Sequence, residues 1–200
     1  MKWLEPPFNM LISAPTCSGK TEFVMHLLQT HYKGAFDYII IICPTFTNNK
    51  AYDKRFIYRD KDIVVLIPHV ETINETVELA YEVYTRGGEI LIILDDCAFS
   101  KDVKSRVNIL TKLAFSARHD NVSVWVLTQQ FTSIAKTFRE NIGMLVLYYT
   151  PSKNDVKEVI ENYGMELSKE EVSSYIKQLK EIPYSKLVFR LRQPYSINLI

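Results

Sequence analysis

The chain has 200 residues, of which 47% are apolar and 24% are charged, as in ordinary globular proteins that bury a full core. Its formal net charge of +1 excludes a uniformly basic coat for nucleic acid, although it is compatible with a local basic stripe. The longest apolar run, residues 38–43, is too short to cross a bilayer, so we expect no membrane-spanning segment.

The cysteines and the N-terminal residues indicate the compartment. Cys17, Cys43 and Cys97 are odd in number and widely spaced, which favours neither a disulfide framework nor a zinc site. The first residues do not contain the apolar core of a signal peptide. We therefore expect reduced thiols and an intracellular, reducing compartment.

The N-terminal segment combines a strand, a turn and a helix. An apolar run at 8–12 leads into the small residues of 13–21, and helical spacing continues from Gly19 to about Tyr32, near Gly34. This order, with Gly-Lys-Thr at the end of the turn, is typical of a P-loop, whose backbone N–H groups wrap a triphosphate. The predicted nucleotide-binding residues are Ala14, Pro15, Thr16, Cys17, Ser18, Gly19, Lys20 and Thr21.

Two residues of this turn would contact the ligand, and a third departs from the P-loop pattern. Lys20 would reach the β- and γ-phosphates of ATP, and the Thr21 hydroxyl would bind Mg²⁺. Ala14 stands where the P-loop pattern has its first glycine. An alanine suits that position only if its backbone keeps a negative φ, because a positive φ is costly for a residue with a Cβ.

Strands and helices alternate through the rest of the chain. Apolar runs predict strands at residues 36–43, 63–67, 89–96, 122–130 and 144–149, and those at 36–43 and 89–96 are typical of strands buried on both faces. Apolar residues at helical spacing predict helices at 72–85, 105–117, 132–141, 155–163 and 169–180. The last segment, 186–192, alternates between apolar and polar residues, which predicts an edge strand with one face in water.

This alternation predicts an α/β fold of three layers with a mainly parallel central sheet. We expect a single P-loop domain over residues 1–200, with its core at about 7–150. The C-terminal helices and the edge strand would form an extension at about 151–200. In such a sheet the ligand binds at the carboxyl ends of the strands.

Polar side chains stand at those predicted strand ends. Asp95 suits the carboxylate that holds Mg²⁺, and Asp96 is placed to orient and deprotonate an attacking water. Gln129 ends the next strand, where its amide could contact the γ-phosphate or that water, and Gln130 offers the same chemistry. The alternative is that the two carboxylates only end a strand and open a loop.

Arg118 follows a predicted helix closely. An arginine at a helix end commonly complements the helix dipole, and the residues alone favour that interpretation. The alternative is an arginine finger that reaches the γ-phosphate of a neighbouring subunit. Arg106 and Arg139 are weaker candidates for a finger.

The ordered motifs resemble the poxvirus-type DNA-packaging ATPases of large DNA viruses, virophages and polinton-like elements, within the FtsK–HerA superfamily. The resemblance covers about residues 7–129. It rests on the apolar residues 7–12 before the P-loop, the P-loop, the Asp95–Asp96 pair, and Ala117-Arg118-His119 followed by residues 124–129. It implies a RecA/FtsK-like P-loop fold of the ASCE class.

The resemblance also implies a function and a set of partners. It implies an ATPase motor that pumps double-stranded DNA into a preformed capsid. The motor would be a homo-oligomeric ring, a pentamer or hexamer, that meets a capsid or portal vertex protein. It would work in the host cytoplasm, the nucleus or a viral factory, or remain with the virion.

Site roles follow from the same resemblance. It implies that the catalytic residues are Lys20, Asp96, Gln129 and Arg118, with Arg118 acting from the adjacent subunit, and that the metal-binding residues are Thr21 and Asp95. Two positions depart from the family pattern, because Ala14 replaces the first glycine and Asp96 stands where many members have glutamate.

Two other functions compete with a packaging motor. A P-loop kinase or other small-molecule phosphotransferase has a similar size, although the Asp-Asp strand end and the glutamine favour a hydrolase. A nucleotide-gated scaffold without turnover is supported only by Ala14. DNA contacts are expected from a loop at 48–55 or at 100–104, and the residues favour neither.

Overall fold

In a computed structural model the chain forms one mixed sheet with helices on both faces. The structure describes residues 3–46, 50–52, 63–67, 79, 82, 87–97, 115, 121–164 and 167–200. The described strands are β1 (Asn9–Ser13), β2 (Tyr38–Ile42), β3 (Ile63–Ile67), β4 (Ile90–Asp95), β5 (Val122–Thr128), β6 (Met144–Tyr148), β7 (Lys186–Arg190) and β8 (Ser196–Leu199). The described helices are α1 (Lys20–Thr30), α6 (Lys136–Arg139), α7 (Lys153–Tyr163) and α8 (Lys169–Glu181), with 3₁₀ turns η2 (Lys50–Tyr52) and η5 (Phe131–Ser133).

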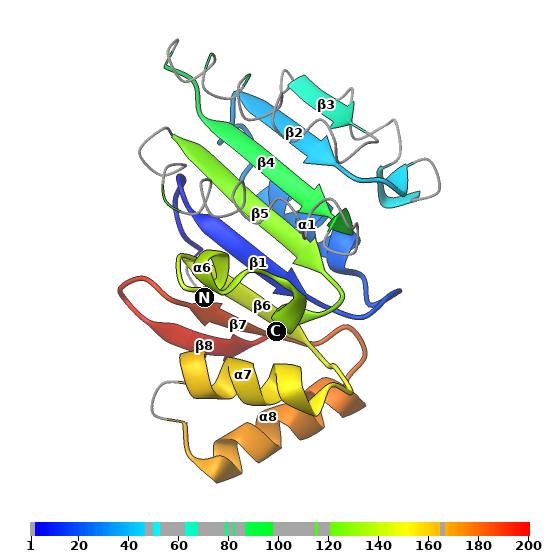
Figure 1. The fold of residues 1–200 in the computed structure, drawn as a ribbon, viewed down its shortest axis with the longest axis vertical. Coiled ribbons are helices and arrows are strands. Elements are labelled where there is room, and N and C mark those ends of the chain that lie inside the picture. Colours follow the sequence, from blue (N-terminus) through cyan, green and yellow to red (C-terminus); the bar gives the residue numbers. More distant parts are fainter. Residues whose placement is uncertain are drawn as a thin grey trace.

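The sheet follows the order β3-β2-β4-β5-β1-β6-β7-β8 (Figure 1). Neighbouring strands from β3 to β6 are parallel, whereas β7 pairs antiparallel with both β6 and β8. All residues of β1, β4, β5 and β6 are buried, which explains why their sequences are apolar runs without alternation. The predicted α/β fold with a mainly parallel sheet is confirmed.

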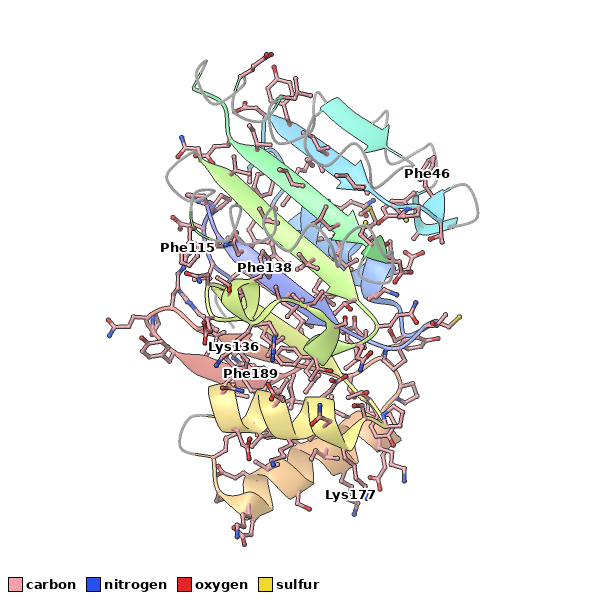
Figure 2. All side chains as sticks on the ribbon, in the orientation of Figure 1. Phe46, Phe115, Lys136, Phe138, Lys177 and Phe189 are labelled. Atoms are coloured by element: carbon pink, nitrogen blue, oxygen red, sulfur yellow. The ribbon has the colours of Figure 1, made fainter. Side chains whose placement is uncertain are left out.

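Two buried clusters on opposite faces of the sheet give the fold its three layers. Val24 of α1 belongs to one cluster together with Trp125 of β5. Val159 of α7 belongs to the other cluster. Phe138 of α6 and Phe189 of β7 belong to it as well (Figure 2). Successive residues of a strand point to opposite faces, so each central strand contributes to both clusters.

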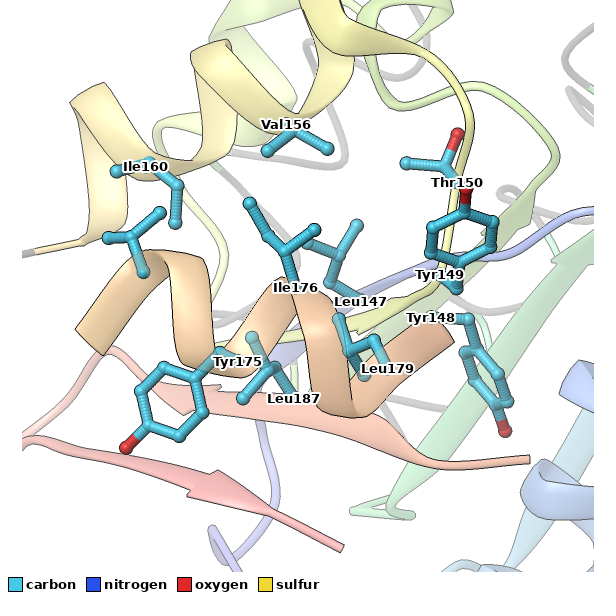
Figure 3. Close-up of a pocket in the computed structure, with 11 residues that line it drawn as sticks. Leu147, Tyr148, Tyr149, Thr150, Val156, Ile160, Tyr175, Ile176, Leu179 and Leu187 are labelled. Atoms are coloured by element: carbon cyan, nitrogen blue, oxygen red, sulfur yellow. The ribbon is translucent and has the colours of Figure 1, made fainter. Parts of the chain in front are cut away.

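The helices α7 and α8 attach to the sheet through apolar side chains (Figure 3). The side chains that meet there come from both helices and from β6 and β7: Leu147, Val156, Ile160, Val172, Ile176, Leu179 and Leu187. Leu147, Leu179 and Leu187 also belong to the buried cluster that contains Phe138. The C-terminal extension thus shares a buried cluster with strands of the P-loop part, and the single domain stays a prediction.

The prediction that residues 186–192 form the edge strand is wrong. β7 lies inside the sheet with four of its five residues buried, and β8 is the last strand in the order. The alternating pattern was misleading because its charged residues lie against protein. The Lys186 ammonium stands 4.8 Å from the centre of the Phe23 ring, and the Arg190 guanidinium donates to the Gln193 carbonyl at 3.3 Å.

Other predicted elements differ at their ends. α1 ends at Thr30, before the positive-φ turn at Gly34. The helix predicted at 132–141 is replaced by the short elements η5 and α6, because ψ is 136° at Ile134 and 131° at Ala135. The helices predicted at 72–85 and 105–117 lie outside the described residues, apart from single positions.

Where the chain is described, none of its helices has the length and apolar character needed to cross a bilayer.

Candidate active site

The strand register brings the predicted site to one edge of the sheet. Ser13 at the end of β1 pairs with Thr128 at the end of β5, and Asp95 at the end of β4 pairs with Leu127. A cleft of about 520 Å³ opens at this edge. Its lining residues are Thr16, Cys17, Ser18, Gly19, Lys20, Thr21, Glu22, Thr45, Ala51, Asp96 and Gln129.

The P-loop accommodates Ala14 without strain. The Ala14 N–H donates to the Thr128 carbonyl at 3.0 Å and so continues the pairing of β1 with β5. Ala14 is not among the described non-glycine residues with a positive φ; in this turn the left-handed positions are Cys17, with φ of 61°, and Gly19, with φ of 82°. The Ser18 hydroxyl donates to the Pro15 carbonyl at 2.7 Å and closes the turn. The departure at the first glycine therefore leaves the loop intact.

The first turn of α1 presents an anion-binding end to the cleft. Gly19 is the N-cap, and no described side chain caps it. The free N–H groups and the helix dipole at such an end attract phosphate. Lys20 and Thr21 follow directly, and only 7% and 8% of their surfaces are exposed.

Asp95 is a fully buried carboxylate at the foot of the cleft. Its Oδ2 accepts hydrogen bonds from the Thr21 hydroxyl at 3.0 Å and from the Tyr52 hydroxyl at 2.7 Å. Burial raises the pKa of Asp95, while the Tyr52 hydrogen bond and the Lys20 charge act in the opposite direction. Oδ1 is buried and has no hydrogen-bond partner within the described part of the chain.

These groups fit Mg²⁺. The Thr21 hydroxyl and the Asp95 carboxylate supply the oxygen ligands that this ion prefers, and the unpaired Oδ1 leaves one of them available. Mg²⁺ usually keeps several water ligands, so two protein groups are a sufficient set.

Asp96 contacts two of the other predicted catalytic residues. Its Oδ1 lies 3.3 Å from Lys20 Nζ and also accepts the Gln129 amide at 3.3 Å. Its backbone φ is 53°, a left-handed conformation that aspartate tolerates better than most residues and that recurs at functional sites. The Gln130 amide contacts Thr132 instead, so the structure places Gln129, and not Gln130, at the cleft.

Sequence reasoning missed two residues that hold the site in place. Tyr52 lies in a largely polar segment after β2, and no periodic pattern marks it. Asp155, at the start of α7, accepts both backbone N–H groups of Phe131 and Thr132, at 3.2 and 3.1 Å. Those residues follow Gln129 closely, so Asp155 ties the C-terminal helices to the cleft. An acidic residue in a first helical turn is common, and only burial distinguishes this one.

Arg118 and Arg106 lie outside the described residues, as does the candidate DNA loop at 100–104. Of the loop at 48–55, only 50–52 is described. Arg139 donates to Glu158 at 2.8 Å and lies 4.8 Å from the Phe131 ring centre. These contacts give Arg139 a structural role and weaken its candidacy as a finger.

The chain matches the model of a known protein family. The model of the family described as Poxvirus A32 protein matches residues 1–189. No curated protein matches the chain significantly in sequence.

Solved structures share the fold. The DNA-packaging ATPase B204 from Sulfolobus Turreted Icosahedral Virus has a TM-score of 0.68 at 15% identity, with 98% of each chain covered. The genome packaging NTPase B204 from Sulfolobus turreted icosahedral virus 2, in complex with AMPPCP, has a TM-score of 0.69 at 14% identity, covering 98% of this chain and 97% of that one. The pCW3 conjugation coupling protein TcpA has a TM-score of 0.64 at 10% identity, covering 95% of this chain and 59% of TcpA. At these identities the likeness establishes the fold alone.

Proposed function

The chain belongs to the poxvirus A32 protein family, and from this membership and its P-loop site we infer that it is a viral DNA-packaging ATPase. It binds ATP, and hydrolysis of ATP drives packaging. The observation that carries this proposal is the meeting of Lys20, Asp96 and Gln129 beside the P-loop, with both contacts to Asp96 Oδ1 at 3.3 Å.

The P-loop binds the phosphate chain. The N–H groups of residues 16–21 and the N-terminus of α1 surround it, and Lys20 contacts the β- and γ-phosphates. Thr21 and Asp95 hold Mg²⁺, which when bound neutralises charge on those phosphates.

Asp96 orients and deprotonates the attacking water. A triphosphate is a stronger partner for Lys20 than a single carboxylate is, so we expect Lys20 to move from Asp96 to the phosphates when ATP binds. Asp96 is then free to accept a proton. Gln129, which donates to the same carboxylate, is placed to hold the water or the γ-phosphate.

We propose that the motor acts as a homo-oligomeric ring on double-stranded DNA, in contact with a capsid or portal vertex protein. In this proposal Arg118 reaches the γ-phosphate of the adjacent subunit, and the ring is a pentamer or hexamer. Packaging occurs where capsids assemble, so we place the protein in the infected cell. The support is family membership and the fold shared with B204, which is a DNA-packaging ATPase.

The competing phosphotransferase function predicts a different product. In a reaction with γ-labelled ATP and a mixture of nucleosides and nucleotides, hydrolysis gives labelled inorganic phosphate, whereas a kinase labels an acceptor. We expect inorganic phosphate alone. Lys20→Ala serves as the inactive control, since it removes the phosphate contact. Labelled acceptor from the wild-type chain but not from this control would replace the packaging proposal by the kinase.

A further inference from the structure

The turn between α8 and β7 carries an exposed tyrosine beside the P-loop. β7 begins at Lys186, which pairs with Tyr148, the last residue of β6. Because β6 runs parallel to β1, the turn lies at the same edge of the sheet as the cleft. Tyr184 stands in this turn with 69% of its surface exposed.

The backbone of this turn would suit glycine better than tyrosine. The Ser185 N–H donates to the Ile182 carbonyl at 3.2 Å, which closes a four-residue turn with Pro183 in its second position. Tyr184, in the third position, has a φ of 61°. This is the pattern of a type II turn, whose third residue is normally glycine or asparagine. A strained, exposed aromatic residue at such a position calls for a function.

One edge of the Tyr184 ring packs on the P-loop. A Cβ added to Gly19 would lie 3.4 Å from Tyr184 Cδ1 and 3.8 Å from Cε1, so this edge of the ring lies next to the glycine. Tyr184 is not among the residues that line the 520 Å³ cleft, but Gly19, beside which its ring lies, is one of them. Tyr184 therefore stands just beyond the phosphate-binding turn.

The strand order indicates what reaches this ring. Asp96 and Gln129 follow β4 and β5 on one side of β1, whereas Tyr184 precedes β7 on the other side. A nucleotide whose γ-phosphate lies at Asp96 and whose phosphate chain follows the P-loop across Gly19 would carry its base away from β4 and β5, towards β7. We infer that Tyr184 is the platform on which the base of the bound nucleotide stacks, an inference that rests on the proposed ATP binding. Stacking on one aromatic face favours purines for their larger surface and does not require base-specific hydrogen bonds.

The test compares two ligands on three proteins. Affinities for Mg²⁺-AMPPCP and for Mg²⁺-tripolyphosphate, which has no base, are measured by titration calorimetry for the wild type, Tyr184→Asn and Tyr184→Phe. Asparagine suits the left-handed backbone, so this variant should fold at least as well as the wild type. We expect Tyr184→Asn to lose about tenfold in AMPPCP affinity with tripolyphosphate affinity unchanged, and Tyr184→Phe to keep both.

The matched control is Tyr195→Asn. Tyr195 is 58% exposed and lies in the turn after β7, at the opposite edge, because Arg190 pairs with Met144 at the start of β6. This variant should leave both affinities unchanged. Unchanged AMPPCP affinity in Tyr184→Asn, or equal losses for the two ligands, would overturn the stacking role alone. If the wild type bound neither ligand, the proposed ATPase function would fail with it.

Discussion

Tyr52 donates its hydroxyl to Asp95 Oδ2 at 2.7 Å, to the same oxygen that accepts the hydroxyl of Thr21. Tyr52 is buried, and this burial, reinforced by the Asp95 charge, raises its pKa far above the ordinary value, so its hydroxyl stays protonated. Its ring lies 5.8 Å from that of Phe46. The segment after β2 therefore fixes the orientation of the proposed magnesium-binding carboxylate.

We predict that Tyr52→Phe weakens the response to Mg²⁺. The ring and its packing are retained, but Asp95 loses a hydrogen bond that orients it. The loss of such an outer-shell contact typically lowers metal affinity or activity by about 10- to 100-fold. The measurement is ATP hydrolysis against Mg²⁺ concentration, with nucleotide affinity in EDTA as the second readout, which should not change.

Tyr163→Phe is the control for that variant. The Tyr163 hydroxyl donates to the Arg139 carbonyl at 2.7 Å, and burial raises its pKa to about 12, but Tyr163 is not among the residues that line the cleft. Its loss should leave the Mg²⁺ dependence unchanged. Identical Mg²⁺ curves for Tyr52→Phe and the wild type would show that Tyr52 does not orient the carboxylate.

We predict that Asp96→Asn removes turnover but not binding. The amide cannot accept the proton of the attacking water, and loss of a general base typically costs about 10² to 10⁴ in rate. Nucleotide affinity should be retained or rise, because Lys20 loses the carboxylate that competes for it. Phosphate release and equilibrium binding measure the two effects. Wild-type turnover in this variant would exclude Asp96 as the base, and a wild type without turnover would favour the nucleotide-gated scaffold.

We predict that Arg118→Ala leaves nucleotide affinity nearly intact and lowers turnover by about 10³ to 10⁵, as expected for an arginine finger. If the finger acts between subunits, mixing this variant with Lys20→Ala should restore part of the activity, since each supplies what the other lacks. Mixtures as inactive as the separate variants would contradict action in trans.

We predict that Asp155→Asn destabilises the fold. The carboxylate accepts two backbone N–H groups and the Thr132 hydroxyl, at 2.8 Å, while almost fully buried. Loss of buried hydrogen bonds to a charged group should lower the free energy of unfolding by about 1–3 kcal/mol, measured by urea titration. Glu161→Gln, which removes an exposed ion pair with Lys157, should change it by less than about 0.5 kcal/mol. Equal changes in the free energy of unfolding for the two variants would show that Asp155 does not anchor α7 to the segment after β5.

Local patterns were sufficient to predict the core of the site. Buried parallel strands are apolar runs, and the first polar residue after such a run marks the ligand edge, which is why Asp95, Asp96 and Gln129 could be predicted to lie together. The P-loop is equally local, since the strand, turn and helix are contiguous in the sequence.

What could not be predicted depends on contacts between distant segments. Tyr52 reaches Asp95 across 43 residues, and no periodicity marks it. Lys186 and Arg190 alternate like residues of an edge strand, yet one packs on aromatic rings and the other is buried beside a turn. Tyr184 owes its position to a positive φ, which its residue type would not suggest.

The most direct test of the packaging motor is ATP hydrolysis by one size-fractionated preparation, measured with and without long double-stranded DNA. We predict that the fraction of ring size releases phosphate and that the rate of release rises with DNA length. In the same fraction Asp96→Asn should release no phosphate, with or without DNA. Hydrolysis that is indifferent to DNA in every fraction, or confined to the monomer, would contradict the packaging motor.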